Sequence, residues 1–122
     1  MLRGDLGAGK TEFVRGLASA LCTDVPVRSP SFAIVNEYPC EPRIYHADLY
    51  RVSSRDEFEE LDLLDESSDG VLVVEWPERA GGGLDEYDIE VWISRPDPYD
   101  DLRIIGLDSP DPGLSGIIST LE

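Results

Sequence analysis

The chain has 122 residues, of which 41% are hydrophobic and 30% charged, a composition typical of one folded globular domain rather than a disordered chain. Its formal net charge of −16 opposes contact with a phosphate backbone, so we expect no unaided binding to nucleic acid. No apolar run reaches the roughly 18 residues of a membrane span, and no signal peptide is evident, so the sequence indicates a cytoplasmic protein without a membrane partner.

The first third of the chain predicts one helix and two strands. Residues 10–22 carry apolar side chains at helical spacing, so a helix is expected to begin directly at a glycine-rich loop. Pro26 and Pro30 mark a loop, because a residue before proline avoids the helical conformation. The apolar pattern then predicts strands over residues 31–37 and 44–50.

The middle of the chain predicts a second helix and a buried strand. Ser54 and Glu57 form a capping box, which opens a helix that is expected to run to about Leu64 with Phe58, Leu61 and Leu64 inward. The continuous apolar run over 71–76 ends in an acidic and an aromatic residue and is typical of a strand buried on both faces.

The last third predicts two alternating strands and a tail. The strands cover residues 87–94 and 102–107 and are separated by a turn at 96–98. A stretch rich in Ser, Pro and Gly follows. We therefore expect one domain over residues 1–108 and a flexible tail over 109–122.

Charge and cysteines are unevenly placed. The first 40 residues hold four acids and four bases, so the whole excess of sixteen negative charges lies after residue 40. Solubility is the simplest interpretation of that surface, and contact with a basic partner is the alternative. Cys22 and Cys40 lack CxxC spacing, so we expect two reduced structural thiols.

The strongest local signal is the segment GDLGAGKT at residues 4–11, which matches the pattern GxxxxGK[ST] in full. Its glycines let successive backbone N–H groups point at phosphate oxygens, and the positive end of the following helix adds to the attraction. In this pattern the ammonium of Lys10, the only lysine of the chain, reaches the β- and γ-phosphates, and the Thr11 hydroxyl binds Mg²⁺. The motif predicts a nucleoside triphosphate site.

A buried strand should lead into such a loop, but only three residues precede Gly4. We therefore expect this strand to be missing from the sheet, and we expect residues 1–122 alone to fold poorly.

Two acids at predicted strand ends are candidates to organise Mg²⁺ and water. Glu75 follows the apolar run VLVV, as in a Walker B site, and Asp48 ends the run IYHA. His46 lies two residues before Asp48 and so shares its face of the strand. A packed or partner-facing role is expected for this histidine.

Four motifs together resemble the TsaE (YjeE) family: GDLGAGKTEFVRGLA, then SPSF at 29–32, HADLYR at 46–51 and VEWPE around Glu75. The resemblance covers about residues 2–107. It implies an α/β P-loop NTPase fold of three layers with a mostly parallel central sheet, normally preceded by a further helix and strand. It also implies weak ATP hydrolysis in support of TsaB and TsaD, which place threonylcarbamoyl on the adenosine beside the tRNA anticodon, so that tRNA is contacted only through the complex.

The resemblance also assigns roles to residues, with ATP and Mg²⁺ as cofactors. Thr11 and Glu75 would hold Mg²⁺, Asp48 would lie near the γ-phosphate or the metal, and Trp76 would lie beside the site. Ser31 stands where the family's SPTF loop has threonine. Lys10, Asp48 and Glu75 are the predicted catalytic residues. The predicted nucleotide contacts are Asp5, Leu6, Gly7, Ala8, Gly9, Lys10, Thr11 and Glu12.

Two other functions stay open at this point. A nucleotide-gated binding module would need little turnover, and no arginine of the sequence is obviously aligned with the P-loop, which suits weak hydrolysis and activation by a partner. A small-molecule kinase usually needs a lid that carries arginines. The only long loop of the sequence that could serve as such a lid is the glycine stretch Gly81–Gly83.

Overall fold

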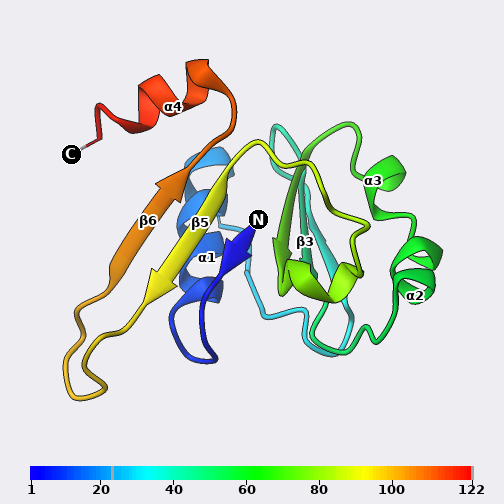
Figure 1. Ribbon diagram of the computed structural model, residues 1–122, viewed down its shortest axis with the longest axis horizontal. Coiled ribbons are helices and arrows are strands. Elements are labelled where there is room, and N and C mark those ends of the chain that lie inside the picture. Colours follow the sequence, from blue (N-terminus) through cyan, green and yellow to red (C-terminus); the bar gives the residue numbers. More distant parts are fainter. Residues whose placement is uncertain (23, 122) are drawn as a thin grey trace.

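The computed structural model describes residues 1–22 and 24–121. Within them, six strands form one sheet in the order β2-β3-β4-β1-β5-β6 (Figure 1). The four central strands run parallel, and the edge strands β2 and β6 pair in antiparallel fashion with β3 and β5. The strands are β1 Leu2–Arg3, β2 Val35–Tyr38, β3 Ile44–Asp48, β4 Val71–Glu75, β5 Glu90–Ser94 and β6 Ile104–Asp108.

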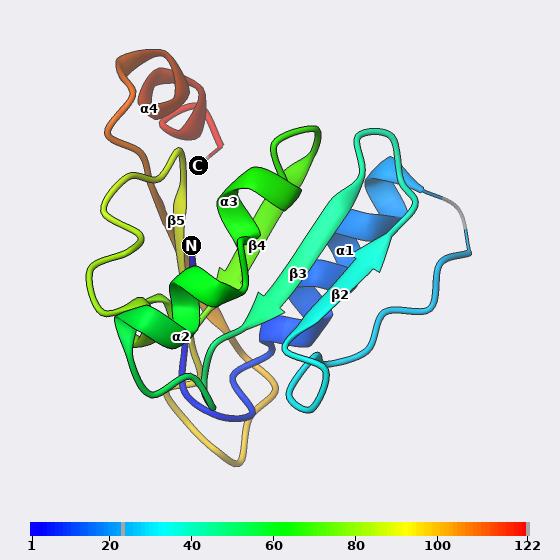
Figure 2. The same ribbon diagram turned by 90° about the vertical axis from the view of Figure 1, so that its right-hand side faces the viewer.

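Helices cover both faces of the sheet, which gives three layers. Helix α1, Lys10–Leu21, packs Val14 and Ala18 onto one face together with Leu2, Ile44 and other core residues. Helices α2, Arg55–Glu60, and α3, Leu63–Glu66, lie on the opposite face (Figure 2). The predicted α/β class with a mostly parallel sheet is confirmed.

The second predicted helix is interrupted. Ser54 accepts the backbone N–H of Glu57 as the capping box requires, but Asp62 adopts a left-handed conformation with φ of 52° and separates α2 from α3. The break turns Leu63 inward beside Phe58, whereas Leu64, which was predicted to face the core, is 54% exposed. A continuous helix would not place residues five apart on one face.

Three strands begin later than the patterns predicted, at Val35, Glu90 and Ile104. For β2 the reason is local. Ile34 has a φ of 69°, which no extended strand tolerates, and residues 31–33 form a turn before it.

The strand before the loop of residues 4–9, called the glycine loop below, was expected to be missing but is present as the short strand β1. Leu2 is 1% exposed and pairs with Glu75 on one side and Val91 on the other. The backbone N–H of Val91 also donates to the carbonyl of Met1 at 2.9 Å. Two residues are therefore enough to place the loop between β4 and β5.

The two cysteines form a disulfide, so the expectation of free thiols was wrong. Cys22 follows α1 and Cys40 follows β2, and their Cα atoms lie 4.8 Å apart. Their spacing in the sequence gave no sign of this, because the contact depends on the β2–β3 hairpin lying beside the end of α1.

The segment from Ser109, for which a flexible tail was expected, contains helix α4, Pro112–Ile118. The Asp111 carboxylate accepts the backbone N–H groups of Gly113 and Leu114, and Pro112 occupies the first turn. A short turn of 3-10 helix, η1 Pro77–Ala80, precedes the three consecutive glycines at 81–83. None of the helices in the described residues is both long and apolar enough to cross a membrane.

Candidate functional site

The glycine loop joins β1 to α1 in the conformation that its sequence predicts. Gly7 and Gly9 have φ values of 77° and 114°, in the region that favours glycine, and the N–H of Ala8 donates to the Asp5 carbonyl at 3.0 Å. Gly4 is required for a different reason: a Cβ there would lie 2.7 Å from the Ile93 carbonyl oxygen on β5. The loop therefore curls tightly over the sheet and leaves residues 5–7 exposed.

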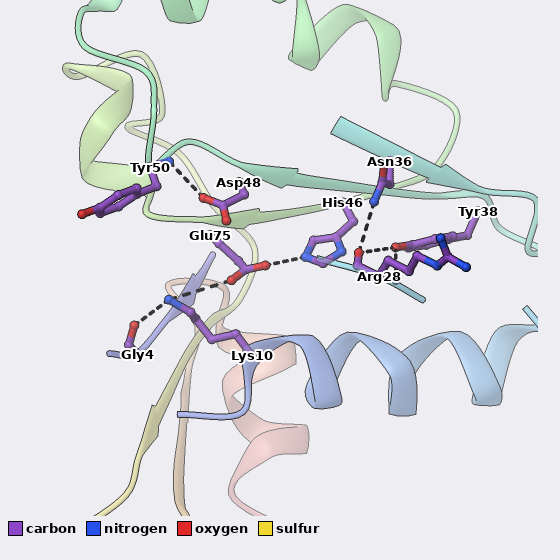
Figure 3. A network of polar contacts seen from close by, with 9 residues as sticks. All are labelled: Gly4, Lys10, Arg28, Asn36, Tyr38, His46, Asp48, Tyr50 and Glu75. Carbon is purple, nitrogen blue, oxygen red and sulfur yellow. Dashed lines mark hydrogen bonds and ion pairs between the residues drawn. The ribbon is translucent and has the colours of Figure 1, made fainter. Parts of the chain in front are cut away.

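Lys10, the first residue of α1, turns its buried side chain back under the loop. Its ammonium donates to the Gly4 carbonyl at 2.6 Å and lies 3.8 Å from Glu75 Oε1 (Figure 3). The same nitrogen lies 4.2 Å from the centre of the Trp76 ring, within the range of a cation–π contact. The only lysine is thus fixed between the loop, an acid and an aromatic face.

The two predicted acids lie side by side. Asp48 and Glu75 end β3 and β4 and are partners in the parallel register, so both project on the α1 face of the sheet. Both are buried. Their juxtaposition follows from the sheet, because the carboxyl ends of parallel strands meet at one edge.

Glu75 and Asp48 have different contacts. Oε2 of Glu75 lies 2.6 Å from Nε2 of His46, whose side chain is fully buried. Asp48 instead uses Oδ1 to accept the backbone N–H of Tyr50 at 2.9 Å. The structure therefore brings Lys10, Glu75 and His46 into one polar chain, with Asp48 beside it.

The remaining predicted residues lie at the loop with fewer contacts. Thr11 is half-buried in the first turn of α1, whereas Glu12 is exposed and pairs with Arg15 on the outer face of the helix. Glu12 can contribute its backbone N–H to the loop, but its carboxylate is engaged elsewhere.

Two strained positions flank this site. Ile34, after the SPSF segment, and Trp76, directly after Glu75, both have positive φ, at 69° and 56°. Such conformations cost about 1–3 kcal/mol and gather at functional sites. Phe32 of the SPSF segment is 82% exposed, and the Arg51 guanidinium lies 4.5 Å from its ring centre.

Sequence reasoning missed Arg103. It stands 95 positions after Ala8, yet its Nε donates to the Ala8 carbonyl at 2.8 Å and so ties the β5–β6 connection to the loop. No spacing rule could have found this contact, because it depends on how the β5–β6 hairpin folds back beside β1.

The donor set fits a nucleotide with Mg²⁺. A Cβ at Gly9 would be strained, the loop offers backbone N–H groups, and Lys10 supplies the cation. Within the described residues, no group of three or more His, Cys, Asp or Glu side chains could hold a metal alone. Mg²⁺ is commonly bound by one or two carboxylates together with substrate phosphates, and the Thr11 hydroxyl and Glu75 carboxylate could hold it in that way.

Comparison with known proteins identifies the family. Residues 1–103 match the family Threonylcarbamoyl adenosine biosynthesis protein TsaE. The tRNA threonylcarbamoyladenosine biosynthesis protein TsaE of Haemophilus influenzae is 42% identical over 108 residues, covering 87% of this chain and 66% of the relative. The protein of the same name from Aquifex aeolicus is 49% identical over 81 residues, covering 64% of this chain and 56% of the relative.

The chain thus spans about two thirds or less of the length of these two relatives. A crystal structure of YdiB from Bacillus subtilis superposes with a TM-score of 0.68 at 31% identity, covering 98% of this chain and 72% of that one. Fold, motifs and family match agree: this chain has the P-loop NTPase fold and belongs to the TsaE family.

Proposed function

We propose that this chain is a weak, Mg²⁺-dependent ATPase that supports the TsaB–TsaD pair in the threonylcarbamoylation of tRNA. The observation that carries the proposal is the position of Lys10, whose ammonium lies under the glycine loop within 3.8 Å of Glu75. An ammonium beside backbone N–H groups suits a polyphosphate, and a neighbouring carboxylate suits its metal. The relatives named for tRNA threonylcarbamoyladenosine biosynthesis support the pathway.

Each residue of the site has a role in this proposal. The backbone of residues 5–12 wraps the phosphates, and Lys10 neutralises charge on the β- and γ-phosphates. Thr11 and Glu75 hold the metal, and Asp48 lies near the γ-phosphate. Mg²⁺ held by Thr11 and Glu75 would offset the negative charge of the phosphates during hydrolysis.

The charge of the surface supports action through protein partners. The sixteen excess negative charges after residue 40 repel tRNA, so the isolated protein should not retain tRNA at physiological salt. We infer that tRNA is reached only within the TsaB–TsaD complex, in the cytoplasm, and that ATP strengthens the association. A gel shift of bare tRNA by micromolar isolated protein would contradict this inference.

The test is ATP hydrolysis by the chain alone, with TsaB–TsaD added, and with Mg²⁺ chelated. We expect slow hydrolysis alone, a clear increase with partners, and loss of hydrolysis on chelation. Hydrolysis that neither requires Mg²⁺ nor responds to the partners would contradict the proposal.

One observation favours the second candidate, a nucleotide-gated binding module. Both oxygens of the Glu75 carboxylate have neighbours, Lys10 and His46, which suits slow turnover. A Glu75→Gln variant that binds ATP and still supports threonylcarbamoylation in a reconstituted reaction would favour gating over hydrolysis.

A further inference from the structure

The contact between His46 and Glu75 is the most buried polar interaction of the site. The His46 side chain is fully buried on β3, and its Nε2 lies 2.6 Å from Glu75 Oε2 on the neighbouring strand β4 (Figure 3). One residue, Ala47, separates His46 from Asp48, so both lie on the α1 face of β3. The imidazole therefore lies behind Glu75, on the side away from the glycine loop.

The surroundings of the ring fix the position of its proton. Nδ1 is buried, and no described residue offers it a hydrogen bond. A proton on Nδ1 would leave a buried donor without an acceptor, which incurs the full desolvation cost of that group. A proton on Nε2 instead donates to the Glu75 carboxylate, so the neutral ring with Nε2–H fits the site.

This donor restrains the carboxylate. With Oε2 held by His46, the other oxygen, Oε1, faces the Lys10 ammonium at 3.8 Å. The Glu75 side chain therefore cannot turn about its last bond without breaking a buried hydrogen bond. The oxygen that remains on the loop side is the one that the proposed function requires for the metal.

We propose that His46 is a positioning residue, whose Nε2–H orients the Glu75 carboxylate toward the glycine loop. The role rests on the proposed function, because it concerns how Glu75 presents an oxygen to Mg²⁺ and the phosphates. Hydrogen-bond partners of metal-binding groups typically change metal affinity or activity by about 10–100-fold when they are removed.

The first experiment does not depend on activity. His46 is the only histidine of the chain, so ¹⁵N-histidine labelling gives a single ring in the NMR spectrum. We expect one ring proton, bonded to Nε2 and protected from exchange with water, and we expect Glu75→Ala to remove the protection. An unprotonated Nε2, or a ring proton that Glu75→Ala leaves unchanged, would overturn the proposal even if the protein never hydrolysed ATP.

The second experiment separates positioning from packing. His46→Phe keeps a planar ring but no donor, and His46→Gln keeps an N–H donor. We expect the Phe variant to lower kcat by about 10–100-fold with little change in the Kd for ATP measured without Mg²⁺, and to raise the Mg²⁺ concentration needed for half-maximal rate. The Gln variant should recover most of the loss, and Glu75→Ala should abolish the difference between the two variants.

Tyr38→Phe is the control for packing. The Tyr38 ring centre lies 6.2 Å from that of His46, and among the described residues its hydroxyl bonds only to the Arg28 backbone. This change should therefore shift the melting temperature without changing kcat. Equal losses in the Phe and Gln variants that follow their melting temperatures would show a packing role and overturn the proposal. Wild-type protein that neither binds nor hydrolyses ATP would instead refute the proposed function, and the NMR result would still decide the His46–Glu75 contact.

Discussion

The two ends of the central strand β1 are built differently. At its carboxyl end, the chain enters the glycine loop. There the buried side chains of Lys10, Glu75 and His46 contact one another in a row. At its amino end, β1 begins opposite Glu75, the last residue of β4. In the part of the chain that the structure describes, residues 71–74 of β4 therefore have no strand on that side, and an apolar cavity of about 490 Å³ lies there.

We therefore expect the carboxyl end of β1 to set the geometry of the site and its amino end to affect the stability of the fold. Leu2 and Arg3 alone connect β4 to β5 and place Gly4 against the Ile93 carbonyl. The cavity is lined by residues such as Phe13, Leu17 and Val73, which belong to the core rather than to the site. Changes at the carboxyl end should thus affect catalysis, and changes at the amino end should affect stability.

Lys10→Ala should have the largest effect on activity. Its ammonium is the cation under the loop, so its removal should abolish hydrolysis and strongly weaken ATP binding. Calorimetric titration with ATP measures the binding. Arg15→Ala is the matched control, because Arg15 is an exposed cation of the same helix that pairs with Glu12, and it should change little. Unchanged affinity and turnover in the Lys10 variant would refute the P-loop assignment.

Two buried glutamates on the strands that flank β1 test which groups around this strand serve the site and which serve the fold. Glu75→Gln should lower hydrolysis by on the order of 10²–10³-fold, the usual effect of losing one preorganised polar group, and this loss should exceed its effect on stability. Glu90→Gln should instead lower stability more than it lowers hydrolysis. Glu90 binds Arg3 of β1 on the other side of the strand, and weakening this charged hydrogen bond should cost about 1–3 kcal/mol of stability.

Hydrolysis rates and thermal melts of both variants decide the matter. If Glu75→Gln retains full Mg²⁺-dependent activity, the Walker B role passes to Asp48, its partner in the register. If Glu90→Gln loses activity without losing stability, the Arg3–Glu90 pair serves the site rather than the fold.

The sequence predicted the parts of the molecule that depend on local order. The loop and α1 were predictable because GDLGAGKT specifies backbone conformation, and the pairing of Asp48 with Glu75 was foreseeable because both end buried strands. The Cys22–Cys40 bond and the contact of Arg103 with Ala8 depend on hairpins folding back over long separations, which no local pattern encodes. The break at Asp62 was hidden by a capping box that predicts where a helix begins but not where it ends.

The disulfide should have a purely structural effect. It closes a loop of 18 residues between the end of α1 and the end of β2, remote from the glycine loop at the other end of the helix. Loop-closure entropy predicts about 3 kcal/mol of stabilisation for a loop of this length. Cys22→Ser and Cys40→Ser should each lower the melting temperature, with unchanged hydrolysis by the folded protein.

Reductant is the internal control for this prediction. In reducing buffer the wild-type protein should have the same melting temperature as the two variants. In oxidising buffer its melting temperature should be higher than theirs. Identical melting of wild type and variants in oxidising buffer would show that the bond adds no stability.

The smallest expected effect concerns the amino end of β1. A fused segment of about five strand-forming residues, placed before Met1, should pair with residues 71–74 of β4 and fill the apolar cavity. Each fully buried large apolar side chain contributes about 1.5–3 kcal/mol, but each ordered residue costs about 1–2 kcal/mol of backbone entropy. Backbone hydrogen bonds add about 1 kcal/mol each, so the opposing contributions nearly cancel and we expect only a small rise in melting temperature. The same fusion with two prolines is the control, because proline cannot donate to the ladder. A higher melting temperature with the strand-forming segment alone, at unchanged ATP turnover, would show that the amino end of β1 affects stability but not catalysis. Equal melting temperatures of the two fusions would contradict this expectation and would suit a cavity that Phe13 and Leu17 fill by repacking.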